Sequence, residues 1–375
     1  MHLSAGTSIG GVREELDAQP ARGPGLVATP CSHYGRPVRF GQVSISSVAH
    51  VDGADRVTSQ ELETKLAEPM RRLGLQPGFL EGVTGIRARR MWGVEFQPSE
   101  AATAAAELAI EQAGIDRGRL GIVINTSVCR DYIEPSTSCI VHSNLGLGPD
   151  CINFDLGNAC LGFLNAMDIV GNMIERGQIE YGLVVDGENS RFVVESTIAR
   201  LNDPNLEEAT FRENFATLTL GSGGAAMVLG RSDLVTGGHR FVGGVTSAAT
   251  EHHQLCRGQV DQMQTKSKEL LIAGVTLAKQ TYAMAKRELG WNPDVVAEYI
   301  LHQVSRANTD KLAEALELPS DKFMHAYVEL GNVGPAAVPM VLSKAAEAGR
   351  IESGDRVALM GIGSGLNCSM SEIIW

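Results

Sequence analysis

The stretch FDLGNACLGF, residues 154–163, holds a change from strand pattern to helix pattern on which the interpretation of the whole chain depends. The apolar run CINFDL (151–156) predicts a buried strand, and the amphipathic run at 160–177 predicts a helix. Cys160 therefore stands where the strand gives way to the helix, near the partial positive charge of a helix N-terminus. This position predicts an acidic, nucleophilic thiol, and a buried structural cysteine is the alternative.

Strand and helix patterns alternate on both sides of this stretch. Before residue 236, strands are predicted from Val38 and at 120–125, 151–156, 181–187 and 223–230, and helices at 58–74, 99–114, 135–146 and 160–177. After it, strands are predicted at 241–250, 298–302, 323–328, 356–362 and 367–375, and helices at 267–290, 305–317 and 335–349. The order predicts an α/β fold of two similar halves, 38–235 and 236–375, each with a mainly parallel sheet. Pairing the halves would bury a layer of helices between the sheets.

The first 37 residues differ from the rest, because they hold six Gly and four Pro with little apolar periodicity. We expect a flexible N-terminal extension at 1–37, outside the fold. The whole chain has 375 residues, 43% of them hydrophobic and 20% charged, which is typical of a large folded protein. Its net charge of −12 disfavours binding to nucleic acid or to anionic lipid.

The seven cysteines are scattered and odd in number, without the spacing of zinc ligands. Neither a disulfide framework nor a metal site is expected. We interpret Cys139, Cys151 and Cys368 as structural. No apolar stretch is long enough to span a membrane and the N-terminus lacks a secretory pattern, so we expect a cytoplasmic protein with no stable membrane insertion.

Two residues of the second half are candidates to act with Cys160. His302 ends the predicted strand EYILH, although a histidine there is more often structural. Asn332 lies between Gly331 and Gly334 ahead of a predicted helix, where a simple turn is the alternative. If the halves superimpose, Asn332 precedes the third helix of its half as Cys160 opens the third helix of the other, and all three side chains converge near one pseudo-twofold axis.

The glycine-rich segment MGIGSGLNCS, residues 360–369, resembles a dinucleotide-binding motif at first sight. The alternating pattern that follows it predicts a strand, whereas phosphate binding needs a helix N-terminus there, so we reject the nucleotide interpretation. Glycines between two strands bring backbone N–H groups close to a reacting atom, as an oxyanion hole requires.

Together these segments resemble the thiolase superfamily, specifically the β-ketoacyl synthase III-like condensing enzymes. The resemblance covers nearly everything from residue 38 onward and implies a five-layered αβαβα core. It rests on FDLGNACLGF (154–163), TGIRARR (84–90), HQVSRAN (302–308), GNVGPAAVP (331–339) and GIGSG (361–365). Within that group the chain is most similar to the OleA-type acyl-CoA condensing enzymes of olefin and β-lactone formation. That closer similarity rests on INTSVCRDYIEPSTS (124–138), VVDGE (184–188), CRG (256–258) and LMGIGSGLNCSM (359–370).

The chain departs from ordinary synthase III at three positions. Phe79 and Val83 replace the Trp and Arg that hold CoA there, and Ser305 replaces an Asn three residues after the catalytic His. CoA contacts of ordinary synthase III are therefore not transferred to this chain.

The resemblance implies a role for each matching residue. Cys160 would carry the first acyl group as a thioester, with its own N–H and that of Gly363 or Gly365 forming the oxyanion hole. His302 and Asn332 would donate hydrogen bonds to the second thioester carbonyl. Glu134, in an apolar acyl channel that raises its pKa, would remove an α-proton, because an unactivated acyl-CoA loses no carbon dioxide. A surface loop acid is the alternative for Glu134.

The resemblance implies no cofactor beyond the CoA of the substrates. It also implies a homodimer in which the neighbour contributes channel wall, including the Glu134 loop, and later pathway enzymes as further partners. The leading hypothesis is an acyltransferase that joins two long-chain acyl-CoAs by non-decarboxylative Claisen condensation, giving a β-ketoacyl-CoA or β-keto acid. The alternatives are a decarboxylating β-ketoacyl synthase III that uses a malonyl donor, and a structural partner subunit of a heterodimeric condensing enzyme.

Overall fold

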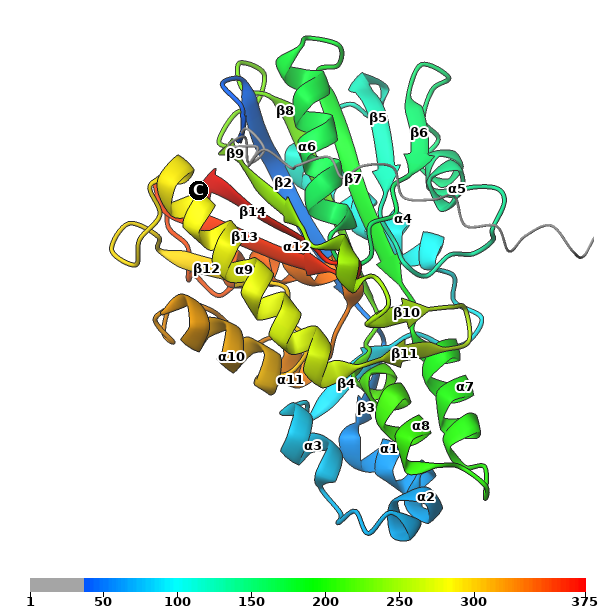
Figure 1. Ribbon diagram of the computed structural model, residues 1–375. Coiled ribbons are helices and arrows are strands. Elements are labelled where there is room, and N and C mark those ends of the chain that lie inside the picture. Colours follow the sequence, from blue (N-terminus) through cyan, green and yellow to red (C-terminus); the bar gives the residue numbers. More distant parts are fainter. Residues whose placement is uncertain (1–36) are drawn as a thin grey trace, which may run out of the picture. The chain divides into compact units, whose positions relative to one another are not determined.

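The computed structural model describes residues 37–375, so the extension predicted at 1–37 lies outside the described residues except for Pro37. Ten strands form one sheet in the order β12–β13–β14–β9–β2–β8–β7–β5–β6, with β1 beside β9 (Figure 1). These strands are β1 Val38–Arg39, β2 Val43–Asp52, β5 Leu120–Asn125, β6 Ile152–Asp155, β7 Tyr181–Glu188, β8 Gly223–Arg231, β9 His239–Ala248, β12 Glu298–Leu301, β13 Arg356–Gly363 and β14 Asn367–Ile374. The predicted boundary at 235/236 falls in the connection from β8 to β9.

The sheets of the two halves are joined, because β2 pairs with β9 through Ser44 and Ile45. Each half-sheet is mixed, so the prediction of mainly parallel sheets is wrong. The parallel pairs are β5–β6, β5–β7 and β12–β13, and the antiparallel pairs include β2–β8, β7–β8, β9–β14 and β13–β14. The link 364–366 is too short for a helical crossover, so β13 and β14 form a hairpin and must run antiparallel.

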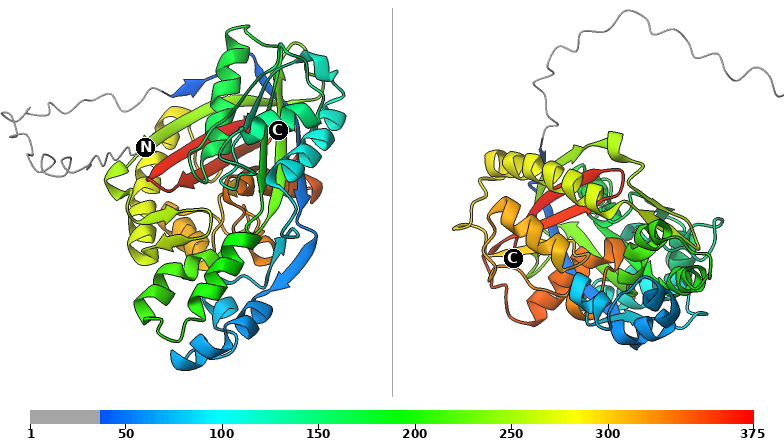
Figure 2. Two further views of the ribbon diagram at one scale, coloured as in Figure 1. Left: turned by 90° about the vertical axis from the view of Figure 1, so that its right-hand side faces the viewer. Right: turned by 60° about the horizontal axis from the view of Figure 1, so that its bottom comes forward.

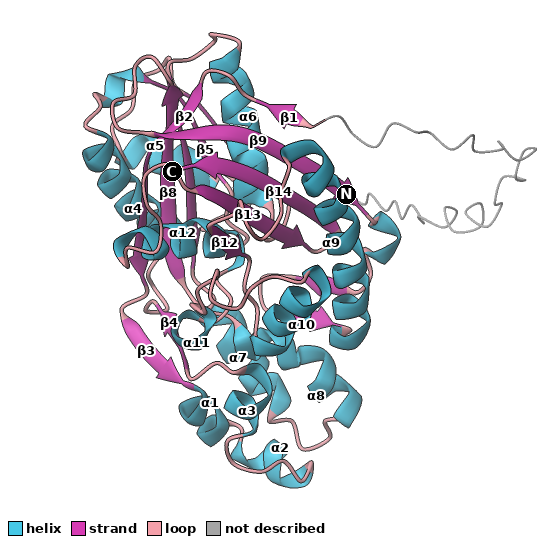
Figure 3. Ribbon diagram, turned by 90° about the vertical axis from the view of Figure 1, so that its left-hand side faces the viewer, coloured by secondary structure: helices cyan, strands magenta, loops and turns pink. Residues whose placement is uncertain are grey.

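Helices cover both half-sheets and fill the space between them. The helices of these layers are α4 Pro98–Ala113, α5 Thr137–Asn144, α6 Gly162–Glu175, α9 Ser267–Leu289, α10 Arg306–Leu316 and α12 Ala337–Glu347. Apolar side chains of α6 and α12 share one core with strands of both halves. Separate cores join α4 and α5 to the first half-sheet, and α9 and α10 to the second. Figure 3 shows α4 and α5 on one side of this stack and α9 on the other. The predicted five-layered αβαβα arrangement is confirmed.

A smaller group of helices packs around its own core at the bottom of Figure 1. It comprises α1 Ser59–Lys65, α2 Ala67–Arg72, α3 Phe79–Thr84, α7 Arg191–Leu201 and α8 Glu208–Asn214, with two small antiparallel sheets, β3 Asp55–Thr58 with β4 Ala88–Met91 and β10 Cys256–Gly258 with β11 Met263–Thr265. The helix predicted from Thr58 begins there with a capping box, since Glu61 N donates to Thr58 Oγ1 at 3.1 Å and Thr58 N to Glu61 Oε2 at 2.6 Å. That helix is interrupted at Leu66, and Figure 2 shows the group from two further sides.

The strand predicted at 323–328 does not form. The chain leaves the edge of β12 after Lys322, whose carbonyl accepts from Tyr299 N at 2.7 Å, and turns into the short helix α11, Tyr327–Leu330. Phe323, Tyr327 and Leu330 are still buried. The apolar pattern therefore indicated a buried segment correctly, but its secondary structure was predicted wrongly. Within the described part of the chain, no helix has both the length and the apolar character that crossing a bilayer requires.

Candidate active site

Cys160 lies in a tight turn between β6 and α6, two residues before the helix begins. Ala159 has φ +46°, a backbone conformation that costs energy for a residue with a Cβ atom. The turn is closed by hydrogen bonds from Leu161 N to Asn158 O at 3.0 Å and from Gly162 N to Ala159 O at 3.2 Å. The strand-turn-helix placement predicted for Cys160 is therefore present, and its side chain is partly buried.

The prediction of an acidic thiol at Cys160 is wrong for this resting structure. Burial, with smaller contributions from the nearby Cys256, Glu188 and Asp186, raises the pKa of Cys160 to about 12. Desolvation of the thiolate outweighs the helix N-terminus, which acts over a short range and at a terminus that Cys160 precedes rather than occupies. The resting residue is a neutral thiol.

His302 follows the last residue of β12 and is 7% exposed. Its backbone N–H donates to Met360 O at 2.8 Å, which continues the parallel pairing with β13 by one residue. Burial lowers the pKa of His302 to about 4, and its Nδ1 atom has no hydrogen-bond partner among the described residues. The side chain of His302 is therefore a neutral imidazole.

Asn332 belongs to the second half, and its turn is hydrogen-bonded to the first half of the fold. Its N–H donates to Thr219 O at 2.8 Å and its carbonyl accepts from Gly221 N at 2.9 Å. The side-chain Oδ1 accepts from Gly334 N at 3.1 Å, which leaves the Nδ2 amide as the group that can donate to a ligand. Gly331, with φ +68°, makes this turn possible because a Cβ atom there would lie 2.6 Å from Thr219 O.

The glycine loop between β13 and β14 packs on the cysteine turn. A Cβ atom on Gly363 would fall 2.8 Å from Asn158 O and 3.3 Å from Leu161 N. Asn367 Nδ2 donates to Asn158 Oδ1 at 3.2 Å, which ties the far end of the loop to the same turn. Gly365 has φ +139° and lies within this loop.

A chain of contacts links the segments that carry Cys160, His302 and Asn332. Gly363 touches the turn of Cys160, and His302 is bonded to the strand that ends in Gly363. The turn of Asn332 lies against Glu188, since a Cβ atom on Gly334 would fall 3.4 Å from Glu188 Oε1, and Glu188 is one of the charges that act on Cys160.

Glu134 does not lie in an apolar channel of this chain. It is exposed, next to Tyr132 and Ile133, whose side chains are 58% and 94% exposed. The loop that carries it projects from the core, so this chain does not enclose the Glu134 carboxylate in apolar surroundings.

Carboxylates anchor this loop at three places, so its exposed tip has a fixed position. Glu188 accepts from Val128 N and Cys129 N. Asp131 accepts from Ser99 N at 2.9 Å and from the Ser99 hydroxyl, at the start of α4. Asp155 accepts from Thr137 N and Ser138 N at the start of α5.

Three residues near the site were missed by sequence reasoning. Asp186 and Glu188 end β7, both fully buried; burial raises the pKa of Glu188 to about 7 and that of Asp186 well above its usual range. The sequence signal for these two residues was a pair of acids at the end of the apolar strand YGLVVDGE.

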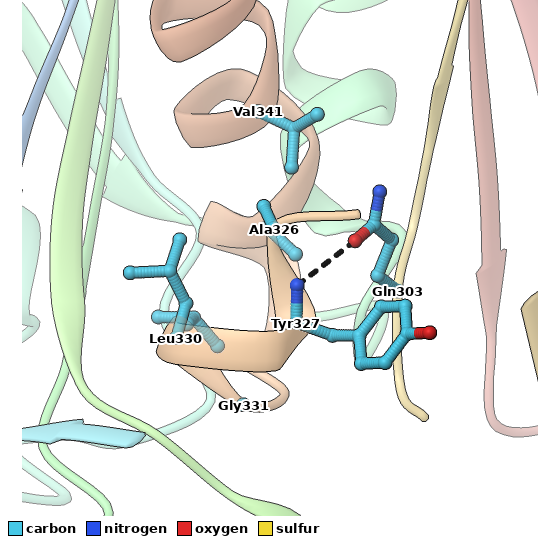
Figure 4. Close-up of a pocket in the computed structure, with 8 residues that line it drawn as sticks. Gln303, Ala326, Tyr327, Leu330, Gly331 and Val341 are labelled. Carbon is cyan, nitrogen blue, oxygen red and sulfur yellow. Dashed lines mark hydrogen bonds between the residues drawn. The ribbon is translucent and has the colours of Figure 1, made fainter. Parts of the chain in front are cut away.

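Gln303 is the third residue that was missed. It accepts from Tyr327 N at 3.0 Å and so links the residue after His302 to the helix that leads to Asn332, beside a small hollow (Figure 4).

Within residues 37–375, no group of three or more His, Cys, Asp or Glu side chains is arranged to hold a metal ion.

The thiolase class of condensing enzymes has two joined α/β halves around an inner helix layer, with a cysteine just before an inner helix. Models of 3-oxoacyl-[acyl-carrier-protein] synthase III match residues 154–248, and the C-terminal model of that family matches residues 287–375.

Similar proteins narrow this class. The chain is 48% identical over 336 residues to an acyl-CoA:acyl-CoA alkyltransferase of Xanthomonas campestris, covering 90% of this chain and 99% of that protein. It is 37% identical over 351 residues to one of Shewanella oneidensis, covering 90% and 100%. A crystal structure of X. campestris OleA with bound lauric acid and lauroyl-CoA has a TM-score of 0.88 at 48% identity and covers 90% of this chain and 100% of that chain. The chain belongs to the OleA family of acyl-CoA:acyl-CoA alkyltransferases.

Crystal structures of that OleA include variants at one cysteine, one glutamate and one histidine. The three substituted residues are separated along their chain by the same numbers of residues as Glu134, Cys160 and His302 are here.

Proposed function

We propose that this chain joins two long-chain acyl-CoAs by non-decarboxylative Claisen condensation through a thioester on Cys160. The observation that carries the proposal is the shared spacing of Glu134, Cys160 and His302 with the substituted residues of an OleA that binds lauroyl-CoA. The neutral thiol and the neutral imidazole support it further, because the thiol still carries its proton and the imidazole is free to accept one when substrate arrives.

In the first half-reaction the sulfur of Cys160 attacks the thioester carbonyl of one acyl-CoA. The neutral imidazole of His302 accepts the thiol proton and returns it to the departing CoA sulfur. The carbon–sulfur bond to CoA breaks as the bond to Cys160 forms. The N–H groups of Cys160 and of Gly363 or Gly365 would stabilise the oxyanion, and the contact of Gly363 with Leu161 supports this assignment.

In the second half-reaction Glu134 removes an α-proton from another acyl-CoA. The Nδ2 amide of Asn332 and an N–H of His302 would donate to the resulting enolate oxygen, a role that the engaged Oδ1 of Asn332 supports. The α-carbon attacks the acyl carbonyl on Cys160, the carbon–sulfur bond breaks, and the cysteine thiolate takes up the equivalent of the proton that Glu134 removed, so that both groups return to their starting forms. The product is a β-ketoacyl-CoA, whose hydrolysis gives a β-keto acid suited to olefin or β-lactone formation.

We further propose a homodimer in which Glu134 acts in the partner's site. The edge strand β6 has one neighbour among the described strands, β5, and exposes Ile152 and Phe154. An unpaired edge with apolar side chains favours pairing with another chain. The exposed tip with Tyr132 and Ile133 belongs to the loop beside this edge and would enter the apolar surroundings that Glu134 lacks here.

The six free cysteines of the described residues fit a reducing compartment, which supports the cytoplasm as the place of this reaction.

Purified protein given myristoyl-CoA as its only substrate tests the proposal. Mass spectrometry is expected to find an acyl adduct on Cys160, free CoA, and a condensed β-keto product. An adduct without product in the absence of a malonyl donor would instead favour a decarboxylating synthase. A Cys160→Ala protein that keeps full turnover would contradict the thioester route.

A further inference from the structure

The start of the Glu134 loop is bonded, residue by residue, to the end of β7. The pairs are Thr126 with Val185 and Asp186, Ser127 with Gly187, and Val128 and Cys129 with Glu188. The last pair is the strongest attachment, because both oxygens of one carboxylate accept backbone N–H groups, at 2.6 Å from Val128 N and 3.0 Å from Cys129 N. Glu188 therefore sets the direction in which the loop leaves the core.

The same carboxylate faces two other parts of the site. Its Oε1 lies 3.4 Å from the place of a Cβ atom on Gly334, whose N–H holds the Oδ1 of Asn332. It also lies close enough to Cys160 to raise the pKa of that thiol. Glu188 is 3% exposed, so its side chain is almost entirely enclosed by protein.

We propose that Glu188 is a positioning residue for the condensation step, a proposal that rests on the function proposed above. It fixes where the loop presents Glu134 and supports the turn that presents Asn332, without touching substrate. A carboxylate suits this place because both of its oxygens accept hydrogen bonds, whereas an amide would turn its N–H2 group toward one of the two backbone N–H groups. Acyl transfer to Cys160 needs neither Glu134 nor Asn332 and should not depend on this support.

Glu188→Gln separates the two steps. Acyl transfer, measured as the adduct on Cys160 with myristoyl-CoA, is expected to proceed at the wild-type rate or faster, since a nearby negative charge is lost. Condensation from the acylated protein is expected to fall about tenfold or more, the effect of one buried donor left without a partner. Hydrogen exchange at the amides of Val128 and Cys129 is expected to accelerate.

Glu372→Gln is the matched control. Glu372 is also 3% exposed and accepts hydrogen bonds from Trp291 and Arg356, but it lies on β14 away from the loop. This variant is expected to lower stability and to leave the ratio of the two rates unchanged. Glu188→Asp, which keeps the charge and shortens its reach, is a second variant and is expected to slow condensation as well.

The proposal is overturned if Glu188→Gln, or Glu188→Asp where the first does not fold, lowers both steps equally or lowers neither. If wild-type protein forms the adduct and no condensed product, the proposed function has failed instead, and the two failures are distinguished by the wild-type control.

Discussion

Gly363 packs directly on the backbone of Leu161, the residue that follows Cys160. A Cβ atom on Gly363 would lie 3.3 Å from Leu161 N and 3.1 Å from Leu161 Cβ. The glycine loop and the cysteine turn therefore have their positions set by each other, and a methyl group added at this contact must displace one of them.

We expect Gly363→Ala to slow acyl transfer to Cys160 and to reduce stability by about 1–3 kcal/mol, the usual cost of overpacking. Gly82→Ala is the control, because a Cβ atom there meets no atom within 4 Å. Denaturant unfolding and the rate of CoA release measure the two effects. Unchanged stability together with unchanged CoA release would show that the loop adapts freely.

Glu134→Gln is expected to keep acyl transfer and to lose condensation, because the amide cannot remove an α-proton. Mixing this variant with Cys160→Ala should restore about one quarter of wild-type activity, since half of the randomly exchanged subunits form mixed dimers with one intact site each. Product formation after subunit exchange is the measurement. If Glu134 acts within its own chain, mixing restores nothing.

The Cys160 thiol is expected to react with iodoacetamide at a rate that rises steadily with pH and reaches no plateau below about pH 10, because its pKa is raised to about 12. Peptide mass spectrometry after timed alkylation reports this site separately from the other cysteines. A plateau near neutral pH would mean that the helix N-terminus outweighs burial.

His302 lowers the stability of the folded chain in acid. Its pKa is about 4 in the folded state and near 6.5 when unfolded, so between these values the unfolded chain binds the extra proton and stability falls as pH falls. At about pH 5 the loss is about 2 kcal/mol relative to pH 7. His302→Asn is expected to remove this part of the acid dependence, measured by denaturant unfolding at both pH values. An identical acid dependence in wild type and variant would refute a buried neutral imidazole.

Periodicity and turn residues were enough to predict most elements, the two halves and the place of Cys160 between β6 and α6. They failed where tertiary contacts decide the backbone, as at 323–328, where apolar alternation is buried in an irregular segment and a short helix. The directions of the strands were also predicted wrongly. The one sequence feature that indicates the antiparallel β13–β14 hairpin is the short link at 364–366, and alternation of strand and helix patterns does not take it into account.

For the candidate site, the sequence predicts the local positions of the residues better than their pKa values, because the pKa values depend on tertiary contacts. Cys160, His302 and Asn332 stand at strand ends and turns that the sequence marks. Their electrostatics do not follow from local position, because burial by distant segments sets the pKa of Cys160 and His302. Glu188 was missed because its partners, Val128 and Cys129, lie in a loop far from it in the sequence.

The pairing of residues 126–129 with the end of β7 makes loop length a determinant of reactivity. Surface loops usually tolerate inserted or deleted residues. Here, one residue added between Cys129 and Glu134 would lengthen the reach of the acid by a fixed step while the anchored stem stays in register. Among related or engineered proteins, the residues at the tip of the loop should therefore vary in identity, while the number of residues between Cys129 and Glu134 should stay constant.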